Sequence, residues 1–77
     1  MTVYIVKNDN GRIYGVFHKK GDAISRLKEE FAYWQNRAKE EQWDEEYTHM
    51  VWRGNWFCVS NEFDEYTACN IEEHEVL

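Results

Sequence analysis

One stretch of helical periodicity constrains this 77-residue chain more than any other feature of its sequence. Ile24, Leu27, Phe31, Trp34 and Ala38 follow one another at spacings of three or four residues, which places all five on one face of a helix. No other part of the chain has this pattern. A single long helix must therefore cover whatever else the chain forms.

The residues at the start of this stretch indicate where the helix begins. Asp22, directly after Gly21, is suited to accept the free amide donors of a first helical turn. We predict a helix over residues 22–42, about 30 Å long at 1.5 Å per residue. Tyr33 lies outside the apolar stripe, and we expect it at the edge of the core or exposed.

Two runs of β-branched and aromatic residues before the helix predict a hairpin. The runs VYIV (3–6) and IYGVF (13–17) flank an Asn-Gly pair, the strongest short signal for a tight turn between strands. We predict strands over residues 2–8 and 11–17. Gly15, inside the second strand, predicts a bulge or the close approach of another element.

A second hairpin is predicted after the helix, around the two-residue loop Gly54-Asn55. In this register four apolar side chains share one face and form the second half of the core. They are Met50, Trp52, Phe57 and Val59. A last strand is predicted within residues 66–76, with Cys69 and Ile71 on one side and Glu72, His74 and Val76 on the other.

These elements predict one domain over residues 1–77, an α+β fold of the order ββαβββ. Its mostly antiparallel sheet has four to five strands, and one long helix packs on one face. The other face stays uncovered, so it could bind a partner or a second copy of the chain, or its aromatics could form a small second core. The aromatic candidates for this face are Tyr4, Tyr14, Trp56 and Tyr66.

The charge of the chain is unevenly distributed. The net charge is −6, which argues against DNA and anionic membranes as direct partners. By segments, residues 1–20 carry +3, residues 21–43 carry −1 and residues 44–77 carry −8. The acidic half could be an ordinary solvated surface, or a row of carboxylates that imitates a nucleic-acid backbone. The candidates are Asp44, Glu45, Glu46, Glu62, Asp64, Glu65, Glu72, Glu73 and Glu75.

Motifs for chemistry are weak. Cys58, Cys69 and the three histidines have no short metal-ligand spacing, so we expect no metal, no cofactor and two reduced thiols. No serine belongs to a nucleophile elbow, and we expect no enzyme activity. Lys19 and Lys20 precede the predicted helix and form a candidate anion site. The chain has no membrane-length apolar run and no secretory leader, so we expect a cytoplasmic protein.

Several short segments resemble a group of small phage-encoded proteins of unknown function. They are VYIV (3–6), GVF (15–17), the helix with Ala23 and Leu27, and the terminal NIEEHEV (70–76). The resemblance implies an accessory protein in the cytoplasm of an infected bacterium. Compact acidic proteins of this origin often resemble anti-CRISPR or anti-restriction inhibitors, which bind a host defence protein.

Three functions follow as hypotheses. The first is inhibition of a bacterial, nucleic-acid-binding defence protein by acidic mimicry, with binding that weakens as salt rises. The second is a non-inhibitory interaction module that uses the open aromatic face, including as a homodimer. The third is sequestration of a small anionic ligand by Lys19, Lys20 and the sheet aromatics.

Overall fold

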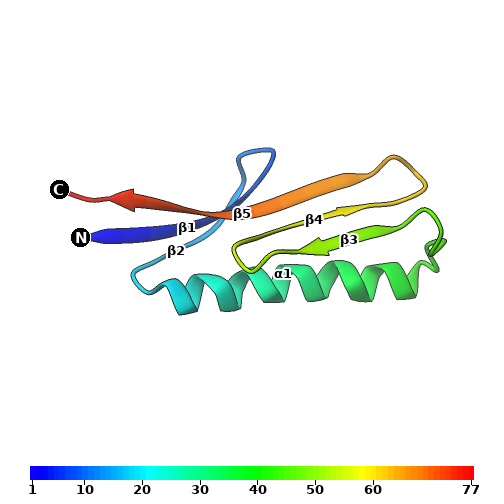
Figure 1. The fold of residues 1–77 in the computed structure, drawn as a ribbon, viewed down its shortest axis with the longest axis horizontal. Helices are drawn as coiled ribbons and strands as arrows, with labels where there is room; N and C mark the ends of the chain where they lie inside the picture. Colours follow the sequence, from blue (N-terminus) through cyan, green and yellow to red (C-terminus); the bar gives the residue numbers. More distant parts are fainter.

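The computed structural model of the protein, which describes residues 1–77, contains one helix and five strands (Figure 1). All strand pairs are antiparallel, and the order of elements confirms the predicted ββαβββ fold. The elements are β1 (Thr2–Asn8), β2 (Ile13–Phe17), α1 (Lys20–Glu40), β3 (His49–Trp52), β4 (Trp56–Ser60) and β5 (Tyr66–Glu75).

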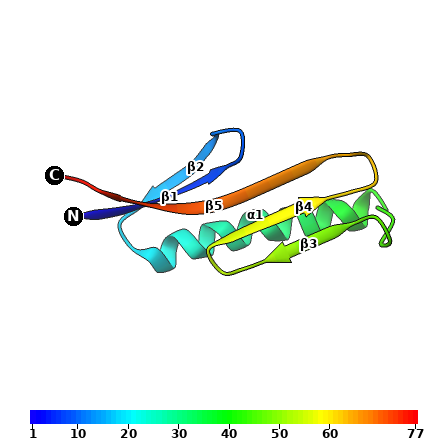
Figure 2. The same cartoon turned by 45° about the horizontal axis from the view of Figure 1, so that its top comes forward.

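The central strand β5 determines the shape of the molecule. The strand order is β2-β1-β5-β4-β3, so β5 pairs with both hairpins. β1 pairs along residues 69–75 of β5, whereas β4 pairs along residues 66–70. Because the hairpins attach to opposite ends of one ten-residue strand, the molecule is elongated, with extents of 46 × 19 × 17 Å (Figure 2).

The turn between β1 and β2 forms around its asparagines and glycine. Asn8 Oδ1 accepts hydrogen bonds from the N–H groups of Asn10 (3.0 Å) and Arg12 (2.9 Å), and Gly11 has a φ of 84°. β2 therefore begins at Ile13, two residues later than predicted, because Gly11 and Arg12 belong to the turn.

The bulge predicted at Gly15 is present beside it. Gly15 and Ile13 pair with successive residues of β1, which leaves Tyr14 between them as an extra residue. A Cβ atom on Gly15 would lie 2.7 Å from the ring of Phe17. Glycine is therefore required for the ring of Phe17 to lie against its own strand.

The second hairpin has the predicted register. Trp52 pairs with Phe57, and the N–H of Arg53 donates to the carbonyl oxygen of Trp56 at 2.9 Å across the Gly54-Asn55 loop. Gly54 has a φ of 88°, a left-handed conformation that glycine adopts without steric cost.

The helix begins and ends two residues earlier than predicted. Lys19 occupies the N-cap position without a side-chain cap hydrogen bond, so the prediction that Asp22 caps the helix was wrong. Asp22 lies inside the first turn, where its charge interacts favourably with the helix dipole. The first turn includes Gly21, because tertiary packing outweighs the low helix propensity of one glycine.

The helix ends in a hydrogen-bonded C-terminal turn of the Schellman type. The N–H of Trp43 donates to the carbonyl oxygen of Ala38 at 2.9 Å, and the N–H of Gln42 donates to that of Lys39 at 3.3 Å. Gln42 has a φ of 52°, although glycine is the usual residue at this position. This turn directs the chain back over the helix and places Trp43 in the core.

The core lies between α1 and the inner face of the sheet. Leu27 and Phe57 are fully buried, and Phe31 packs between Trp52 and Phe57 with ring centroids 5.4 and 5.1 Å away. Tyr33, outside the stripe, is 56% exposed. The buried hydrophobic residues are Val6, Ala23, Leu27, Trp43, Phe57, Val59 and Cys69. Val6, Ala23 and Trp43 were not predicted for the core. Ala23, four residues before Leu27, takes the place on the helix stripe that was predicted for Ile24, and Ile24 is only partly buried.

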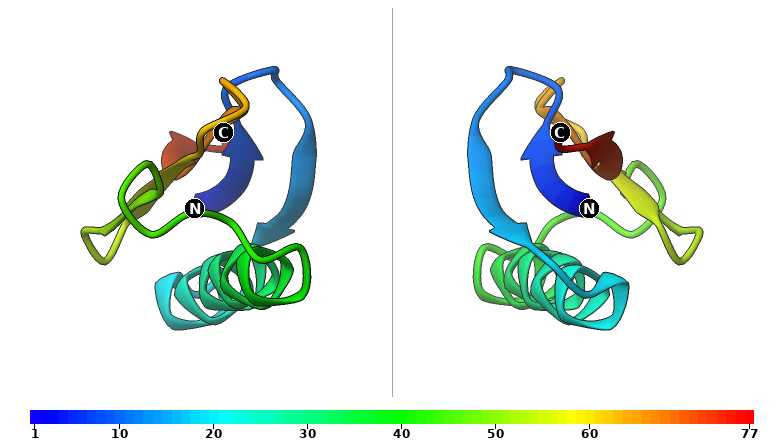
Figure 3. Two further views of the ribbon diagram at one scale, coloured as in Figure 1. Left: turned by 90° about the vertical axis from the view of Figure 1, so that its right-hand side faces the viewer. Right: turned by 90° about the vertical axis from the view of Figure 1, so that its left-hand side faces the viewer.

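The sheet curves over the helix and leaves its outer face uncovered. The two end views show β2 on one side of the helix and the β3–β4 hairpin on the other (Figure 3). Cys58 and Cys69 are free thiols on different faces of the sheet. Cys69 is buried in the core and pairs with Phe57 of β4. Cys58 follows Phe57, so its side chain points to the other face.

Candidate functional site

The loop after α1 and the loop before β5 lie near each other at one end of the molecule (Figure 1). Six of the predicted carboxylates belong to these two loops. The N–H of Asp44 donates to Glu62 Oε1 at 3.0 Å and so joins the two loops. Asp44 Oδ1 in turn accepts from the N–H of Glu46 at 2.9 Å. In the other loop, the buried Asn61 accepts from the N–H groups of Phe63 (2.9 Å) and Glu65 (3.1 Å). The carboxylates are therefore carried by two loops with defined turns.

We call this region the acidic end and define it as eight carboxylates with the cations Arg37 and Lys39. Their balance is −6, which equals the net charge of the whole chain, because the other seven acidic and seven basic residues cancel. The C-terminus of α1 adds the negative end of the helix dipole. The eight are Glu40, Glu41, Asp44, Glu45, Glu46, Glu62, Asp64 and Glu65.

Arg37 is the main internal counter-charge of the acidic end. Its Nε donates to Glu41, and one of its terminal nitrogens lies 3.5 Å from Glu65 Oε2. The hydrogen bond to Glu41 raises the pKa of the Arg37 guanidinium above its usual value. The guanidinium also covers the rings of Trp34 and Trp43, at 5.0 and 5.7 Å from their centroids. Arg37 thus links the acidic loops to the aromatic core.

The other three predicted carboxylates lie at the far end of β5. They therefore do not form one row with the carboxylates of the acidic end. Glu65 and Glu73 are separated by about 27 Å of extended chain at about 3.4 Å per residue. Glu73 lies 4.0 Å from Lys20 Nζ, and Glu75 lies 3.3 Å from the terminal ammonium of Met1. These glutamates are paired with cations, so the continuous row of nine carboxylates does not form.

Glu72 belongs to an ion-pair cluster on the open face of the sheet. Glu72 Oε1 lies 2.6 Å from Lys7 Nζ, and Glu72 Oε2 lies 3.0 Å from His74 Nε2. The hydrogen bonds from Lys7 and then from His74 lower the pKa of the Glu72 carboxyl. The Glu72 carboxylate is therefore engaged in ion pairs within the protein itself.

Two of the four aromatic residues that were predicted for the open face of the sheet lie there. Trp56 is 39% exposed and Tyr66 is 61% exposed, and both have the strand parity of the open face. Tyr4 and Tyr14 were placed wrongly, because both pack against the core on the helix side.

Two physical causes place these tyrosines inside. Tyr4 shares the strand parity of the buried Val6, and the extra bulge residue turns Tyr14 toward the helix. Arg12 and Arg26 lie 5.1 and 5.3 Å from the Tyr14 ring centroid. Burial raises the pKa of the Tyr14 hydroxyl above its usual value.

Lys19 and Lys20 stand at the start of α1, as the anion-site prediction requires. Both residues are exposed, and Lys20 is oriented toward Glu73 at 4.0 Å. An anion bound there would compete with this carboxylate for Lys20. The sequence prediction of an anion site at these lysines stays a prediction.

A cavity of about 370 Å³ opens on the β1–β2 side of the helix and was not predicted. Aromatic residues and two arginines line it, among them Tyr14, Trp34, Arg12 and Arg37. Trp34 Nε1 is buried near it without a hydrogen-bond partner. Arg37 is paired with two carboxylates, whereas Arg12 forms no ion pair and lies over the Tyr14 ring.

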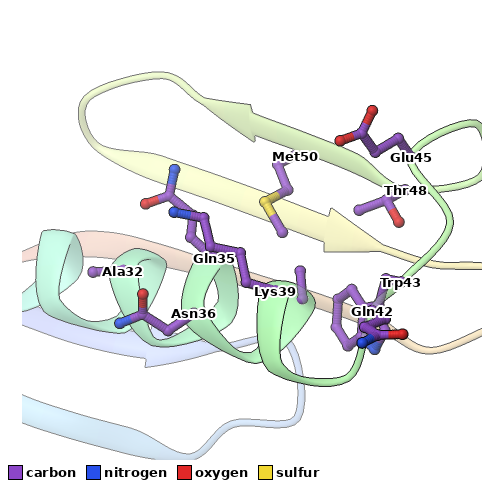
Figure 4. A pocket seen from close by; sticks show the side chains of 10 residues that line it. Ala32, Gln35, Asn36, Lys39, Gln42, Trp43, Glu45, Thr48 and Met50 are labelled. Carbon is purple, nitrogen blue, oxygen red and sulfur yellow. The ribbon is translucent and has the colours of Figure 1, made fainter.

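A larger groove of about 660 Å³ separates the C-terminal half of α1 from β3 (Figure 4). In the figure, Met50 points from β3 toward the helix, and Gln35 rises from the opposite wall. The groove reaches the acidic end at Glu45. Its lining residues are Ala32, Gln35, Asn36, Ala38, Lys39, Gln42, Trp43, Glu45, Thr48 and Met50.

The sequence contains a signal for the groove on one face of the helix. Ala32, Gln35, Asn36 and Lys39 recur at three- and four-residue spacings, as residues on one helix face do. Three of the four are uncharged, and both glutamines of the chain line the groove. This face differs from the heavily charged remainder of the exposed helix surface.

No group of three or more His, Cys, Asp or Glu side chains is arranged to hold a metal ion. The single helix lacks the apolar length needed to cross a bilayer. Comparisons with protein-family models, curated proteins and solved structures find no match for this chain. The resemblance to small phage-encoded proteins therefore stays a prediction from the short segments quoted above.

Proposed function

We propose that this is a non-catalytic binding protein whose acidic end docks on the basic, nucleic-acid-binding surface of another protein. Nucleic acid and the acidic end would compete for that surface. In the setting that the phage-protein resemblance implies, the partner is a bacterial defence protein and the result is inhibition of the anti-CRISPR or anti-restriction kind.

The observation that carries this proposal is the concentration of the entire net charge of −6 at one end of a 46 Å molecule. A field of one sign at one end orients an approaching basic partner and raises the rate of association. Hydrogen bonds fix the backbone of the two loops and the carboxylates of Asp44 and Glu62, so binding orders few backbone groups.

The test uses two variants with the same change in net charge. One carries Glu45→Gln, Glu46→Gln and Asp64→Asn at the acidic end, and none of these three side chains pairs with a cation. The control carries Asp22→Asn, Glu29→Gln and Glu73→Gln, which lie away from the acidic end. Each is used to capture partners from a bacterial lysate, and the captured protein is then titrated with nucleic acid.

We expect the acidic-end variant to bind the captured partner about tenfold more weakly than the control variant, and nucleic acid to displace the wild-type protein. The affinity of the wild-type protein should also fall steeply between 50 and 300 mM salt. Equal affinities for the two variants, or a flat dependence on salt, would refute the proposal.

The exposed apolar side chains of the open face support a second candidate, an interaction module. Ile13 and Val16 are 58% and 57% exposed, and Trp56 and Tyr66 add aromatic surface. In this case Trp56→Ser would abolish partner capture or self-association while the acidic-end variant would bind normally. Sedimentation velocity of both variants separates the two candidates.

A further inference from the structure

The free edge of β3 lies beside the groove and the acidic end. These three features together form one candidate docking surface. β3 is the last strand of the sheet and pairs only with β4. No Cα atom of β3 lies within 8 Å of a Cα atom of α1, and the two elements meet through side chains such as Phe31 and Trp52. The groove occupies the space between them.

The hairpin register identifies the backbone groups available at this edge. In an antiparallel pair, residues alternate between hydrogen-bonded and non-hydrogen-bonded positions. The hydrogen bond from Arg53 to Trp56 makes that pair a bonded one, so Trp52 and Met50 occupy non-bonded positions. Their N–H and C=O groups therefore point away from β4, toward the free edge.

The side chain of Met50 gives the groove an apolar floor next to these groups. Ala38 and Trp43 continue that floor, while Gln35 and Asn36 stand on the helix wall. Amide side chains both donate and accept hydrogen bonds, so they can satisfy the outer backbone groups of an added strand. Every second side chain of such a strand would enter the groove, as alternation along a strand requires.

The charge at the mouth of the groove specifies the partner. β3 starts at His49, directly after the acidic loop, and Glu45 lines the groove. Lys39 is the one cation in the lining, against the eight carboxylates of the acidic end. A segment lying along β3 would therefore place one of its ends in a strongly negative field.

We infer that the protein binds an extended segment of its partner by strand addition to β3, with apolar side chains in the groove and basic residues at the acidic end. The basic character of the segment rests on the proposed function, whereas the strand addition does not. Because every strand pair in the sheet is antiparallel and this pairing is slightly more stable, the basic residues should follow the apolar ones in the bound segment.

The test uses three acetylated peptides. They are TLTLTKKK, its reverse KKKTLTLT, and the control GSGSGKKK, which keeps the three lysines but lacks the alternating apolar side chains. Isothermal titration at 50 mM salt measures their affinity for the wild-type protein, for Ala32→Phe, which fills the groove, and for Ala32→Ser, which leaves it open. Amide hydrogen exchange by NMR follows Met50, Val51 and Trp52 in the same samples.

We expect TLTLTKKK to bind at least fivefold more tightly than KKKTLTLT and at least tenfold more tightly than GSGSGKKK. Ala32→Phe should weaken binding at least fivefold, and Ala32→Ser should not change it. On binding, the amides of Met50 and Trp52 should become protected, while that of Val51, already paired with β4, should change little.

Other outcomes distinguish this inference from the proposed function. If all three peptides bind equally and no β3 amide gains protection, strand addition is refuted although binding to the acidic end survives. If TLTLTKKK binds with the same protection in 50 and 500 mM salt, strand addition holds and the basic partner is refuted. If no peptide binds in low salt, the inference is overturned.

Discussion

Replacing Gln42 by glycine should stabilise the protein, because Gln42 has a left-handed φ of 52° at the end of α1. This conformation costs an L-residue about 1–2 kcal/mol, while glycine adopts it freely. The added freedom of glycine in the unfolded chain costs about 0.4–1 kcal/mol. The difference between the middle values of these ranges predicts a gain of about 0.8 kcal/mol, or an increase in Tm of about 3–6 °C for a domain of this size.

Urea unfolding followed by tryptophan fluorescence measures this effect. Gln42→Ala is the matched control, since it removes the same side chain and keeps the left-handed backbone, so it should not stabilise the protein. Gly54→Ala is the converse test, because Gly54 has a φ of 88°. The strain on alanine there, less the conformational freedom that alanine removes from the unfolded chain, should destabilise the protein by about 0.8 kcal/mol. If Gln42→Gly is no more stable than Gln42→Ala, the strain argument is wrong.

Further predictions concern the ion-paired Glu72 and the buried Cys69. The pKa of Glu72 is lowered below its ordinary value of 4.5, so its contribution to stability is present above pH 4.5 and is lost as the pH falls through the lowered value. Glu72→Gln should therefore flatten the acid limb of the unfolding free energy between pH 2 and 5, whereas an unchanged limb would exclude this ion-pair cluster as its cause. Burial raises the pKa of the Cys69 thiol from 9.0 to about 11, so stability should decline as the pH rises from 9 toward 11. In a Cys58→Ser protein at pH 8, a thiol reagent should label Cys69 only at the rate of unfolding, and rapid labelling of the native protein would contradict its burial.

Local structure was largely predictable because its causes lie within a few residues. The Asn-Gly and Gly-Asn turns set both hairpins, and the stripe from Ile24 to Ala38 set the helix. The errors concern the ends of the helix and strands, and the face of the sheet on which some side chains lie. The bulge turned Tyr14 inward, and the left-handed turn at Gln42 brought Trp43 into the core, and neither event leaves a periodic signal in the sequence.

The candidate site was predictable in composition but not in arrangement. The sequence alone determined a C-terminal half at −8 and an uncovered sheet face. The order of the strands decided which charges meet, because β5 carries Glu73 and Glu75 away from Glu65 and brings them to cations of the N-terminal region.

Turn chemistry and side-chain periodicity are local, so the residues alone indicate the elements, their order and the excess of acidic residues. The meeting of distant segments depends on strand pairing and on the packing of the helix, which no short stretch encodes. The position of the whole net charge at one end, beside a groove and a free strand edge, therefore follows from the folded arrangement of these elements.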